Sequence, residues 1–499
     1  MNPDFEKALH LSRRQFFGRA ASSGIGIAAL AGLLQQEGLA QGTRAPKTGG
    51  QGAAAASGMP PLPGLPHYPA KAKRMVVLWQ GGAPSHVDLF DYKPGLEALR
   101  GQQIPESVRS KGRLSTMTSG QKTYPVLPPI RPFKQYGQSG LWLSTLLPHI
   151  GSIADDLCLV RSMHTEAVNH APGVTFFLTG SPTPGRPSMG AWATYGLGSM
   201  TSDLPAFCVM TSTDQGKTCG QLFYDYYWGS GFLPSKYQGV RFRGEGDPVL
   251  YLANPEGMSR ELRRGALDDI AELNKRRLAD YGDPEIETRI TQYELAYRMQ
   301  TSVPDLLDIS KEPAAVLEMY GPDVKRPGSY ARNCLLARRL IERGVRFVQL
   351  MHSGWDQHGN LDTQLEVQCH DTDQSSAALV KDLKQRGLLD ETIVLWASEF
   401  GRTPFVQGDI TKPNGHGRDH LGTAYSMWVA GGGFQGGMSY GETDEYCYNV
   451  AKDGVHTHDM QATILRALGI DHTRLTYRYQ GRDFRLTDVY GNVVAPLLA

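Results

Sequence analysis

The feature that most constrains the fold is a series of short, almost wholly apolar runs that alternate with longer stretches of helical periodicity. The clearest run is TIVLWAS at residues 392–398, and similar runs occur at 75–79, 157–163, 204–210, 345–351 and 424–432. Helical patterns cover 330–344, 361–387 and 458–469. Continuously apolar strands that alternate with helices predict an α/β fold, in which a mostly parallel sheet is covered by helices on both faces.

A second pattern marks residues 255–325, where charged residues alternate with apolar ones at three- and four-residue spacing. This spacing is typical of surface helices, so we expect a helical insertion near 255–325 in a single α/β domain over 71–499. The chain has 51 Lys+Arg against 50 Asp+Glu, a balance that gives no footprint for nucleic acid or an anionic membrane. The six cysteines form no CxxC pair, which excludes a zinc ribbon.

The N-terminus resembles a twin-arginine export signal. SRRQFF at residues 12–17 is followed by a mild Gly- and Ala-rich apolar run and by a small-x-small site that ends at Ala40. We expect residues 1–40 to be a signal peptide read by the twin-arginine export machinery, and the Gly-, Ala- and Pro-rich residues 41–70 to be a flexible linker. The apolar run is too short to span a bilayer stably, so the mature protein is predicted to be periplasmic or extracellular and not membrane-spanning.

Histidines and carboxylates gather in the loops at the ends of the predicted strands. Nine of the chain's 14 histidines lie in six such loops. Because ligands bind beyond the carboxyl ends of strands in open α/β sheets, this gathering predicts a metal or anion site at that edge. Histidine with carboxylate suits zinc, manganese or iron, and an oxygen-rich set would admit magnesium or calcium. Any one of these histidines, taken alone, is more often a capping or solvent-facing residue.

The order of these loops resembles a known family. GGAPSHVDLFDYKP, NHAPGVTFFLTGSPTPGRPSMGAW, GWDQHGN, SEFGRTP and GRDHLGTAYSMWVAGGG follow one another between about residues 75 and 470. Together they resemble domain-of-unknown-function family 1501, a branch of the alkaline phosphatase superfamily, which also contains sulfatases and phosphodiesterases. The resemblance implies an alkaline-phosphatase-like three-layer α/β sandwich and a divalent metal, with zinc, manganese or calcium as candidates.

Carried over residue by residue, the resemblance also implies individual roles and departures. Glu399 stands at the position of a metal-binding aspartate, and His170 stands where sulfatases have a Cys or Ser nucleophile. Gly81-Gly82 replace the aspartates of the first strand, and Phe400 replaces a His or Asn. The predicted metal ligands are Asp356, His358, Glu399, Asp419, His420, His456 and His458.

Three further residues are candidates for catalysis. His170 is either a nucleophile that forms a phosphohistidine or a metal ligand, and Ser85 is a substitute hydroxyl nucleophile at a strand end. Arg402 is either a bidentate clamp for an anionic group or a surface arginine paired with a carboxylate. In the same way His458, with Asp459, is alternatively only a cap of the last helix.

These assignments leave three functions open. The first is an exported metal-dependent hydrolase of sulfate or phosphate esters, with an anionic ester or glycan as substrate. The second is a non-catalytic scaffold on the same fold that binds glycans or proteins. The third is a phosphoryl- or sulfuryl-transfer enzyme that uses His170. Convergence of Asp356, His358, Glu399 and His420 would favour a metal centre, whereas a Glu399 that pairs only with Arg402 would weaken it.

Overall fold

The central sheet determines the architecture. The computed structural model describes residues 59–212, 214, 223–244, 246–250, 252–409, 411 and 415–499. In these residues one sheet of nine strands has the order β14-β4-β13-β8-β1-β7-β5-β6, with β17 beside β4. Its strands are β1 (Arg74–Gly81), β4 (Leu157–His164), β5 (Phe207–Ser212), β6 (Val240–Phe242), β7 (Phe347–Ser353), β8 (Thr392–Ala397), β13 (Tyr425–Ala430), β14 (Met438–Tyr440) and β17 (Val455–His456). The predicted α/β fold with a mostly parallel sheet is confirmed.

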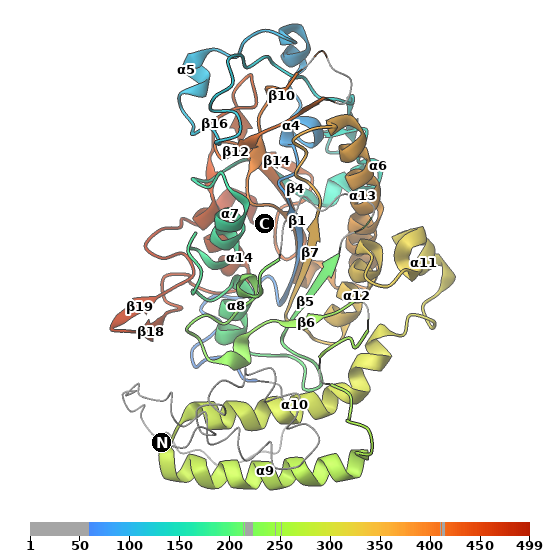
Figure 1. Ribbon diagram of the computed structural model, residues 1–499, viewed down its shortest axis with the longest axis vertical. Coiled ribbons are helices and arrows are strands. Elements are labelled where there is room, and N and C mark those ends of the chain that lie inside the picture. The colour runs from blue at the N-terminus through green and yellow to red at the C-terminus, as the bar shows by residue number, and fades with distance from the viewer. Residues whose placement is uncertain are drawn as a thin grey trace, which may run out of the picture. The chain divides into compact units, whose positions relative to one another are not determined.

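Helices cover both faces of this sheet. Figure 1 shows α12 (Tyr330–Glu342) and α13 (Leu361–Gln385) on one side of the strands. The other side carries α7 (His170–Thr179), α8 (Met189–Leu197) and α14 (Thr457–Ala467). The sheet is therefore the middle layer of three, which explains why its strands are apolar on both faces.

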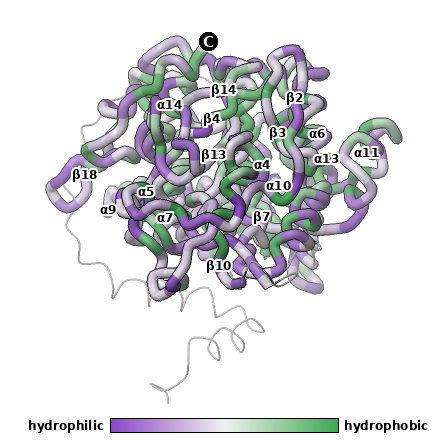
Figure 2. The backbone as a smooth tube through the Cα atoms, turned by 90° about the horizontal axis from the view of Figure 1, so that it is seen from above, coloured by the Kyte–Doolittle hydropathy of each residue, from purple (hydrophilic) through white to green (hydrophobic). Residues whose placement is uncertain are grey.

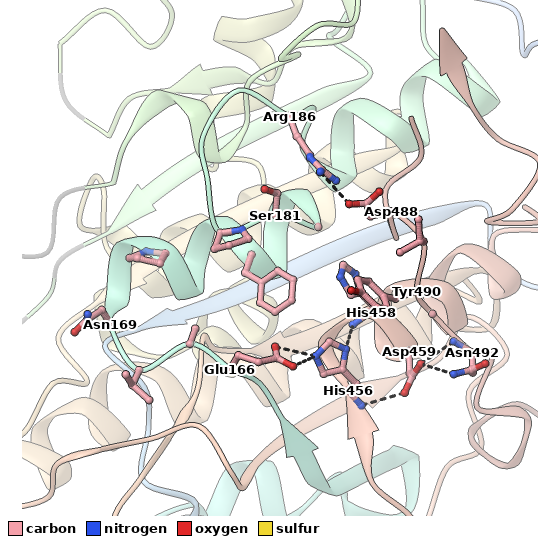
Figure 3. A pocket seen from close by; sticks show the side chains of 18 of the residues that line it. Glu166, Asn169, Ser181, Arg186, His456, His458, Asp459, Asp488, Tyr490 and Asn492 are labelled. Carbon is pink, nitrogen blue, oxygen red and sulfur yellow. Dashed lines mark hydrogen bonds and ion pairs between the residues drawn. The ribbon is translucent and has the colours of Figure 1, made fainter. Parts of the chain in front are cut away.

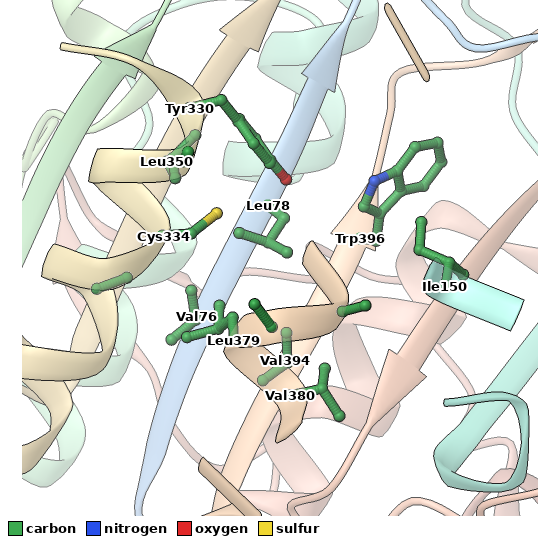
Figure 4. Close-up of a cluster of buried hydrophobic side chains, with 14 of the residues drawn as sticks. Val76, Leu78, Ile150, Tyr330, Cys334, Leu350, Leu379, Val380, Val394 and Trp396 are labelled. Atoms are coloured by element: carbon green, nitrogen blue, oxygen red, sulfur yellow. The ribbon is translucent and has the colours of Figure 1, made fainter. Parts of the chain in front are cut away.

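Alternate residues of each strand enter different cores. Val76 and Leu78 of β1 pack with Val394 and Trp396 of β8 against α12 and α13 (Figure 4). The intervening residues of β1 and β8, such as Val77, face the core formed with α7, α8 and α14. Burying a Val or Leu side chain contributes roughly 1.5–3 kcal/mol, so the continuous apolar runs are required on both faces.

Strand β13 runs antiparallel to its two neighbours in the sheet. It pairs antiparallel with both β4 and β8, whereas β1 pairs parallel with β7 and β8. Its amino end therefore lies at the edge of the sheet where the parallel strands have their carboxyl ends. This direction brings the residues before β13, including His420 in β12 (His420–Leu421), to the same edge as the loops that follow β1, β7 and β8. There β12 pairs with β9 (Gly401–Arg402).

Residues 255–325 are largely helical, with α9 (Arg260–Tyr281), α10 (Pro284–Leu307) and α11 (Ala314–Tyr320). No residue of α9 is buried, and α9 and α10 lie side by side at the end of the sheet away from β10 (Figure 1). The charged composition of α9 fits this exposure. That the segment is an insertion into a single domain stays a prediction.

Smaller elements complete the described chain. They are α4 (His86–Leu89), α5 (Glu106–Arg109), α6 (Pro148–Gly151), β2 (Phe133–Tyr136), β3 (Leu141–Ser144), β10 (Gln407–Gly408), β11 (His416–Gly417), β15 (Glu442–Thr443), β16 (Val450–Lys452), β18 (Tyr477–Tyr479) and β19 (Arg482–Phe484). Figure 2 shows the β18 hairpin as a hydrophilic projection at the margin. None of the helices in the described ranges is long and apolar enough to cross a membrane.

The last part of the predicted 41–70 linker contacts the domain. Residues 1–58, which include the predicted signal peptide, lie outside the described residues. The last part of the predicted 41–70 linker, from residue 59, is bound to the domain. Leu62 N donates to Gly196 O at 2.9 Å and His67 N donates to Gly469 O at 2.8 Å. Leu62 and Leu65 also pack against the core that contains α8, so residues 59–70 are not a flexible tether.

A fully buried ion pair fixes the loop that follows β1. Arg418 donates from Nε to Asp88 Oδ2 at 2.6 Å and from Nη2 to Asp88 Oδ1 at 2.9 Å, and neither side chain is exposed. Arg418 also donates to the carbonyls of Leu127, Pro128 and Thr403. Such a paired arginine holds three chain segments around α4 in one arrangement.

We expect Arg418→Ala to lower the free energy of unfolding by about 3–5 kcal/mol, because it leaves the Asp88 carboxylate buried without its cation. Urea denaturation followed by circular dichroism measures this change. Arg289→Ala, at an exposed position on α10, is the matched control and should change stability by less than about 0.5 kcal/mol. An Arg418→Ala protein as stable as the control would show that the pair contributes nothing.

Candidate metal centre

Four side chains from distant parts of the chain meet at the carboxyl edge of the sheet. They are His170, Asp356, His358 and His420, whose ligand atoms all lie within 4.8 Å of one another. The three Nε2 atoms of the histidines lie 3.3, 2.8 and 3.2 Å from Asp356 Oδ1, in the order of their numbers. His170 begins α7, Asp356 and His358 follow β7, and His420 begins β12. The expected convergence of Asp356, His358 and His420 is therefore found, and His170 joins it.

The far side of each imidazole is held by an acceptor. His170 Nδ1 lies 2.7 Å from Glu399 Oε1, His358 Nδ1 lies 2.6 Å from Gln407 Oε1, and His420 Nδ1 lies 2.8 Å from the Val168 carbonyl oxygen. An Nδ1 that faces an acceptor carries the proton, which leaves the Nε2 lone pair toward Asp356. This arrangement of three histidines is typical of metal ligands, whose second ring nitrogen is oriented by a carboxylate, amide or carbonyl oxygen.

The charges of the cluster also suit a cation. Burial alone would raise the pKa of Asp356, but the Arg402 guanidinium and the three histidines hold that pKa far below its usual value. Burial lowers the pKa of His420 to about 4, so this ring is neutral at pH 7. Burial opposes a charge on His170, yet the neighbouring Asp356 and Glu399 carboxylates raise its pKa overall. An ionised carboxylate and a neutral imidazole are the forms that bind metal, and an ion would replace the proton on His170.

A buried nitrogen of His170 also fits a cation bound at this position. His170 Nε2 is buried and makes no hydrogen bond within the described structure, although Asp356 Oδ1 lies 3.3 Å away. A buried polar atom without a partner is costly, and an ion held by the four side chains would satisfy it. The residues present therefore fit a divalent metal.

Glu399, a predicted ligand, lies behind His170 and not among the four clustered side chains. It is fully buried behind His170, and its Oε1 accepts from His170 Nδ1 and, at 2.9 Å, from the backbone N–H of Gly82. Glu399 follows the end of β8, where its side chain reaches only the outer nitrogen of the ring. Its role is to orient His170. It does not pair with Arg402 alone, so the condition that would weaken a metal centre is not met.

Arg402 is not available to clamp a substrate, which corrects another prediction. Its side chain is buried and donates to the carbonyl oxygens of Gly82, Ala83, Trp355 and Arg418 as well as to Asp356. A guanidinium has five N–H donors in a fixed fork, and these contacts engage Nε, Nη1 and Nη2. Arg402 instead holds Asp356 in place and keeps it ionised.

Two more predicted residues have structural roles. The Asp419 carboxylate accepts from the hydroxyls of Ser115 and Thr118 and from the His420 N–H, and it lies outside the cluster. Ser85 is buried and caps α4, where its Oγ accepts from Asp88 N at 3.3 Å. A loop residue whose hydroxyl or carboxylate accepts from local donors has the same sequence signal as a catalytic residue, so sequence alone does not separate the two roles.

His456 and His458 lie in a separate pocket and not in the cluster. His456 caps α14 and its Nε2 lies 3.1 Å from both oxygens of Glu166, while His458 Nδ1 lies 3.0 Å from Gln461 Oε1 (Figure 3). The alternative prediction gave the cap to His458 with Asp459, but the cap is made by His456 with Asp459. The two histidines thus lie apart from the four clustered side chains, and a ligand role for them stays a prediction.

Sequence reasoning missed the atoms that orient the rings. Gln407 in β10 and the Val168 carbonyl have no sequence signal, because only the folded path of the backbone places each of them behind a histidine.

A second group of candidate ligand atoms, from Asp214, His352 and Asp371, was also not predicted. Both ring nitrogens of His352 already have partners, Ser212 Oγ at 2.9 Å and Gln368 Oε1 at 3.1 Å.

Comparison with known proteins identifies the family. A family model described as "Protein of unknown function (DUF1501)" matches residues 72–498. The chain belongs to this family. The sequence-based assignment to DUF1501 is thereby confirmed, and the match covers nearly all of the described residues. No curated protein sequence is significantly similar to this DUF1501 chain.

Several solved structures have a weak likeness to this DUF1501 protein. They include the PsFucS1 sulfatase from Pseudoalteromonas sp., which is 13% identical, with 80% of this chain and 68% of that chain covered and a TM-score of 0.34. The lipoteichoic acid synthase LtaP from Listeria monocytogenes is 8% identical, with 84% and 74% covered and a TM-score of 0.35. A protein in the alkaline phosphatase superfamily from Vibrio parahaemolyticus is 12% identical, with 81% and 69% covered and a TM-score of 0.30. TM-scores this low carry no conclusion about activity.

The glycine after β1 has a specific purpose at this centre. Gly82 has φ of +108°, and a Cβ there would lie 2.7 Å from Asp356 N and 2.8 Å from Trp355 N. We expect Gly82→Ala to push the Asp356 loop away and to reduce metal affinity by at least about tenfold, as displaced supporting residues do. A calorimetric titration of the metal-free protein with zinc measures the affinity. Gly120→Ala, where a Cβ meets nothing within 4 Å, is the control, and equal affinities for the two variants would contradict the expectation.

Proposed function

We propose that this protein is a divalent-metal-dependent hydrolase of a phosphate or sulfate ester. The observation that carries the proposal is the convergence of three histidines and Asp356, with each ring held from behind by an acceptor. A divalent ion at this position would act as a Lewis acid on an oxygen of the ester. The histidines and Asp356 are 7–21% exposed, so the centre lies just below the surface at the edge of the sheet.

The ligand set favours zinc or manganese over calcium. Three imidazole nitrogens and one carboxylate oxygen match the nitrogen-rich sites of zinc. Calcium takes six to eight oxygen ligands, which this cluster does not offer. Arg402 adds a fixed positive charge beside Asp356, so we expect one ion per chain.

In this proposal the chain's own residues hold the ion and orient its ligands, and they do not act as the nucleophile. His170 is tied to Glu399 through one nitrogen and faces the centre with the other, which argues against a phosphohistidine. Ser85 is used as a helix cap. We therefore infer that water is the nucleophile. Glu399, Gln407 and Arg402 keep the rings and the carboxylate in a fixed geometry, and such preorganisation lowers the barrier to reaction.

A second candidate is a metal-dependent binding protein without catalysis. It is favoured by the engagement of Arg402 with backbone carbonyls, which leaves no guanidinium of the described residues free at the centre to stabilise a transition-state charge. The two candidates differ in turnover and agree in metal binding, so activity on model esters distinguishes them.

The first test is elemental analysis of the purified protein together with hydrolysis of 4-nitrophenyl phosphate and 4-nitrophenyl sulfate. We expect about one zinc or manganese ion per chain, lost in His420→Ala and Asp356→Asn because each removes a direct ligand. Glu399→Gln should weaken metal affinity by about 10–100-fold, since it removes a residue that orients His170. His456→Ala and His458→Ala should keep the ion.

The matched control for this test is His370→Ala, because the His370 side chain is 66% exposed and lies outside the cluster. Metal below background in the wild-type protein, even after divalent ions are added back, would overturn the proposal. A bound ion without hydrolysis of either ester class would favour the binding protein.

We also propose that the protein acts outside the cytoplasm after twin-arginine export, on the basis of SRRQFF at residues 12–17. Replacing Arg13 and Arg14 together by lysine should leave the protein in the cytoplasm, because the export machinery recognises the arginine pair. Cell fractionation and mass spectrometry of the N-terminus, expected after Ala40, measure the outcome. Export of the double variant at the wild-type rate, or an intact N-terminus outside the cytoplasm, would rule out this route.

A further inference from the structure

We propose that the substrate of the centre is an anionic oligosaccharide, bound in an extended groove beside it; this inference rests on the proposed function. The groove consists of two adjoining cavities of about 970 and 650 Å³. They share the lining residues Arg113, Glu166 and Val168. Pockets for drug-sized ligands span roughly 300–1,000 Å³, so the two together exceed the space that a single small ester needs.

The groove borders the metal centre through one short segment. Val168, Asn169 and Pro172 line the larger cavity, and His170 lies between the last two in the chain. The Val168 carbonyl is the acceptor that orients His420. The four candidate ligands are not themselves part of either lining. A chain bound along the groove would thus place one ester group near the centre while its neighbouring rings contact the groove.

The polar groups of the larger cavity suit sugar hydroxyls. Glu166 is 75% exposed and is fixed by His456 Nε2, which lies 3.1 Å from each of its oxygens. Asp459 is held by Asn492 N at 2.7 Å, and the exposed Asn169 makes no side-chain hydrogen bond to its helix. Figure 3 shows Glu166, His456 and Asp459 along one side of this cavity. Carboxylates that are fixed in this way accept from sugar hydroxyls, and an exposed amide both donates to and accepts from them.

An aromatic ring provides a flat contact surface on the same cavity. Tyr490 is 61% exposed and stacks on His458, with ring centroids 5.3 Å apart and planes 18° apart. His458 in turn meets the edge of Phe176 at 5.0 Å. The stack fixes an exposed tyrosine in one orientation beside polar groups, which suits the apolar face of a sugar ring.

Cations line both cavities of the groove. Lys111 lines the smaller cavity and Arg113 lines both; each is exposed and makes no ion pair within the described structure. In the larger cavity, Arg186 pairs with Asp488 through Nη2 at 2.9 Å, while its Nη1 is buried without a hydrogen-bond partner. A ligand that reaches the cations of both cavities must be longer than one sugar ring and must carry more than one anionic group. These requirements define a charged oligosaccharide.

The test measures binding of sulfated dextran oligosaccharides of graded length to the metal-loaded full-length mature protein by calorimetry. We expect affinity to rise with length and then to level off, with neutral dextran oligosaccharides at least about tenfold weaker. Tyr490→Ala and Arg113→Ala should each weaken binding by about tenfold, since anchor residues dominate binding energy. Tyr281→Ala and Arg289→Ala, at exposed positions on α9 and α10, are matched controls and should bind as the wild type does.

The outcome separates this inference from the proposed function. Length-dependent binding that the two groove variants weaken supports the groove even when no ester is hydrolysed, in which case only the hydrolase proposal fails. Hydrolysis of 4-nitrophenyl esters without length-dependent saccharide binding overturns the groove and leaves the hydrolase intact. Binding of polyphosphate as tightly as the sulfated saccharides, with Tyr490→Ala unchanged, also overturns the saccharide assignment.

Discussion

The contact between Asp356 and Arg402 is the interaction on which the rest of the centre depends. Asp356 has a largely buried carboxylate surrounded by three histidines, and Arg402 is the cation that keeps it ionised. Arg402 also joins the loops after β1 and β7 to the segment before β13 through their carbonyl oxygens. A buried charge is tolerated only where it is paired and hydrogen-bonded. The same guanidinium therefore stabilises the loops and sets the electrostatics of the site.

The direction of one strand explains why the site could be predicted only in part. The apolar runs predicted the strands, and the loop residues predicted that Asp356, His358 and His420 would meet. Sequence patterns do not show strand direction, and a parallel β13 would carry its amino end, with His420 before it, to the far edge of the sheet. The pairing of β13 with β4 and β8 is a tertiary choice, because an apolar strand fits either direction.

The roles of individual polar residues were less predictable than their positions. Glu399, Arg402 and Asp419 all lie near the centre as expected, yet none of them is placed to touch an ion or a substrate directly. Each side chain contacts a nearer partner. Glu399 meets a histidine nitrogen, Arg402 donates to a set of carbonyl oxygens, and Asp419 accepts from two hydroxyls. The residue type gives the chemistry of a side chain, but the side-chain angle and the neighbours of its backbone decide which group it meets.

The spacing of the four candidate ligands along the chain has a consequence for assembly. His170 and His420 are 250 positions apart, and they approach each other only when β4, β7 and β13 are in one sheet. An unfolded chain therefore cannot offer the ion a comparable set of atoms, so the ion would bind the native state selectively. At a free-ion concentration 1,000 times the dissociation constant, such selective binding adds about 4.1 kcal/mol to stability. The supplied metal would then stabilise only those chains that have completed folding.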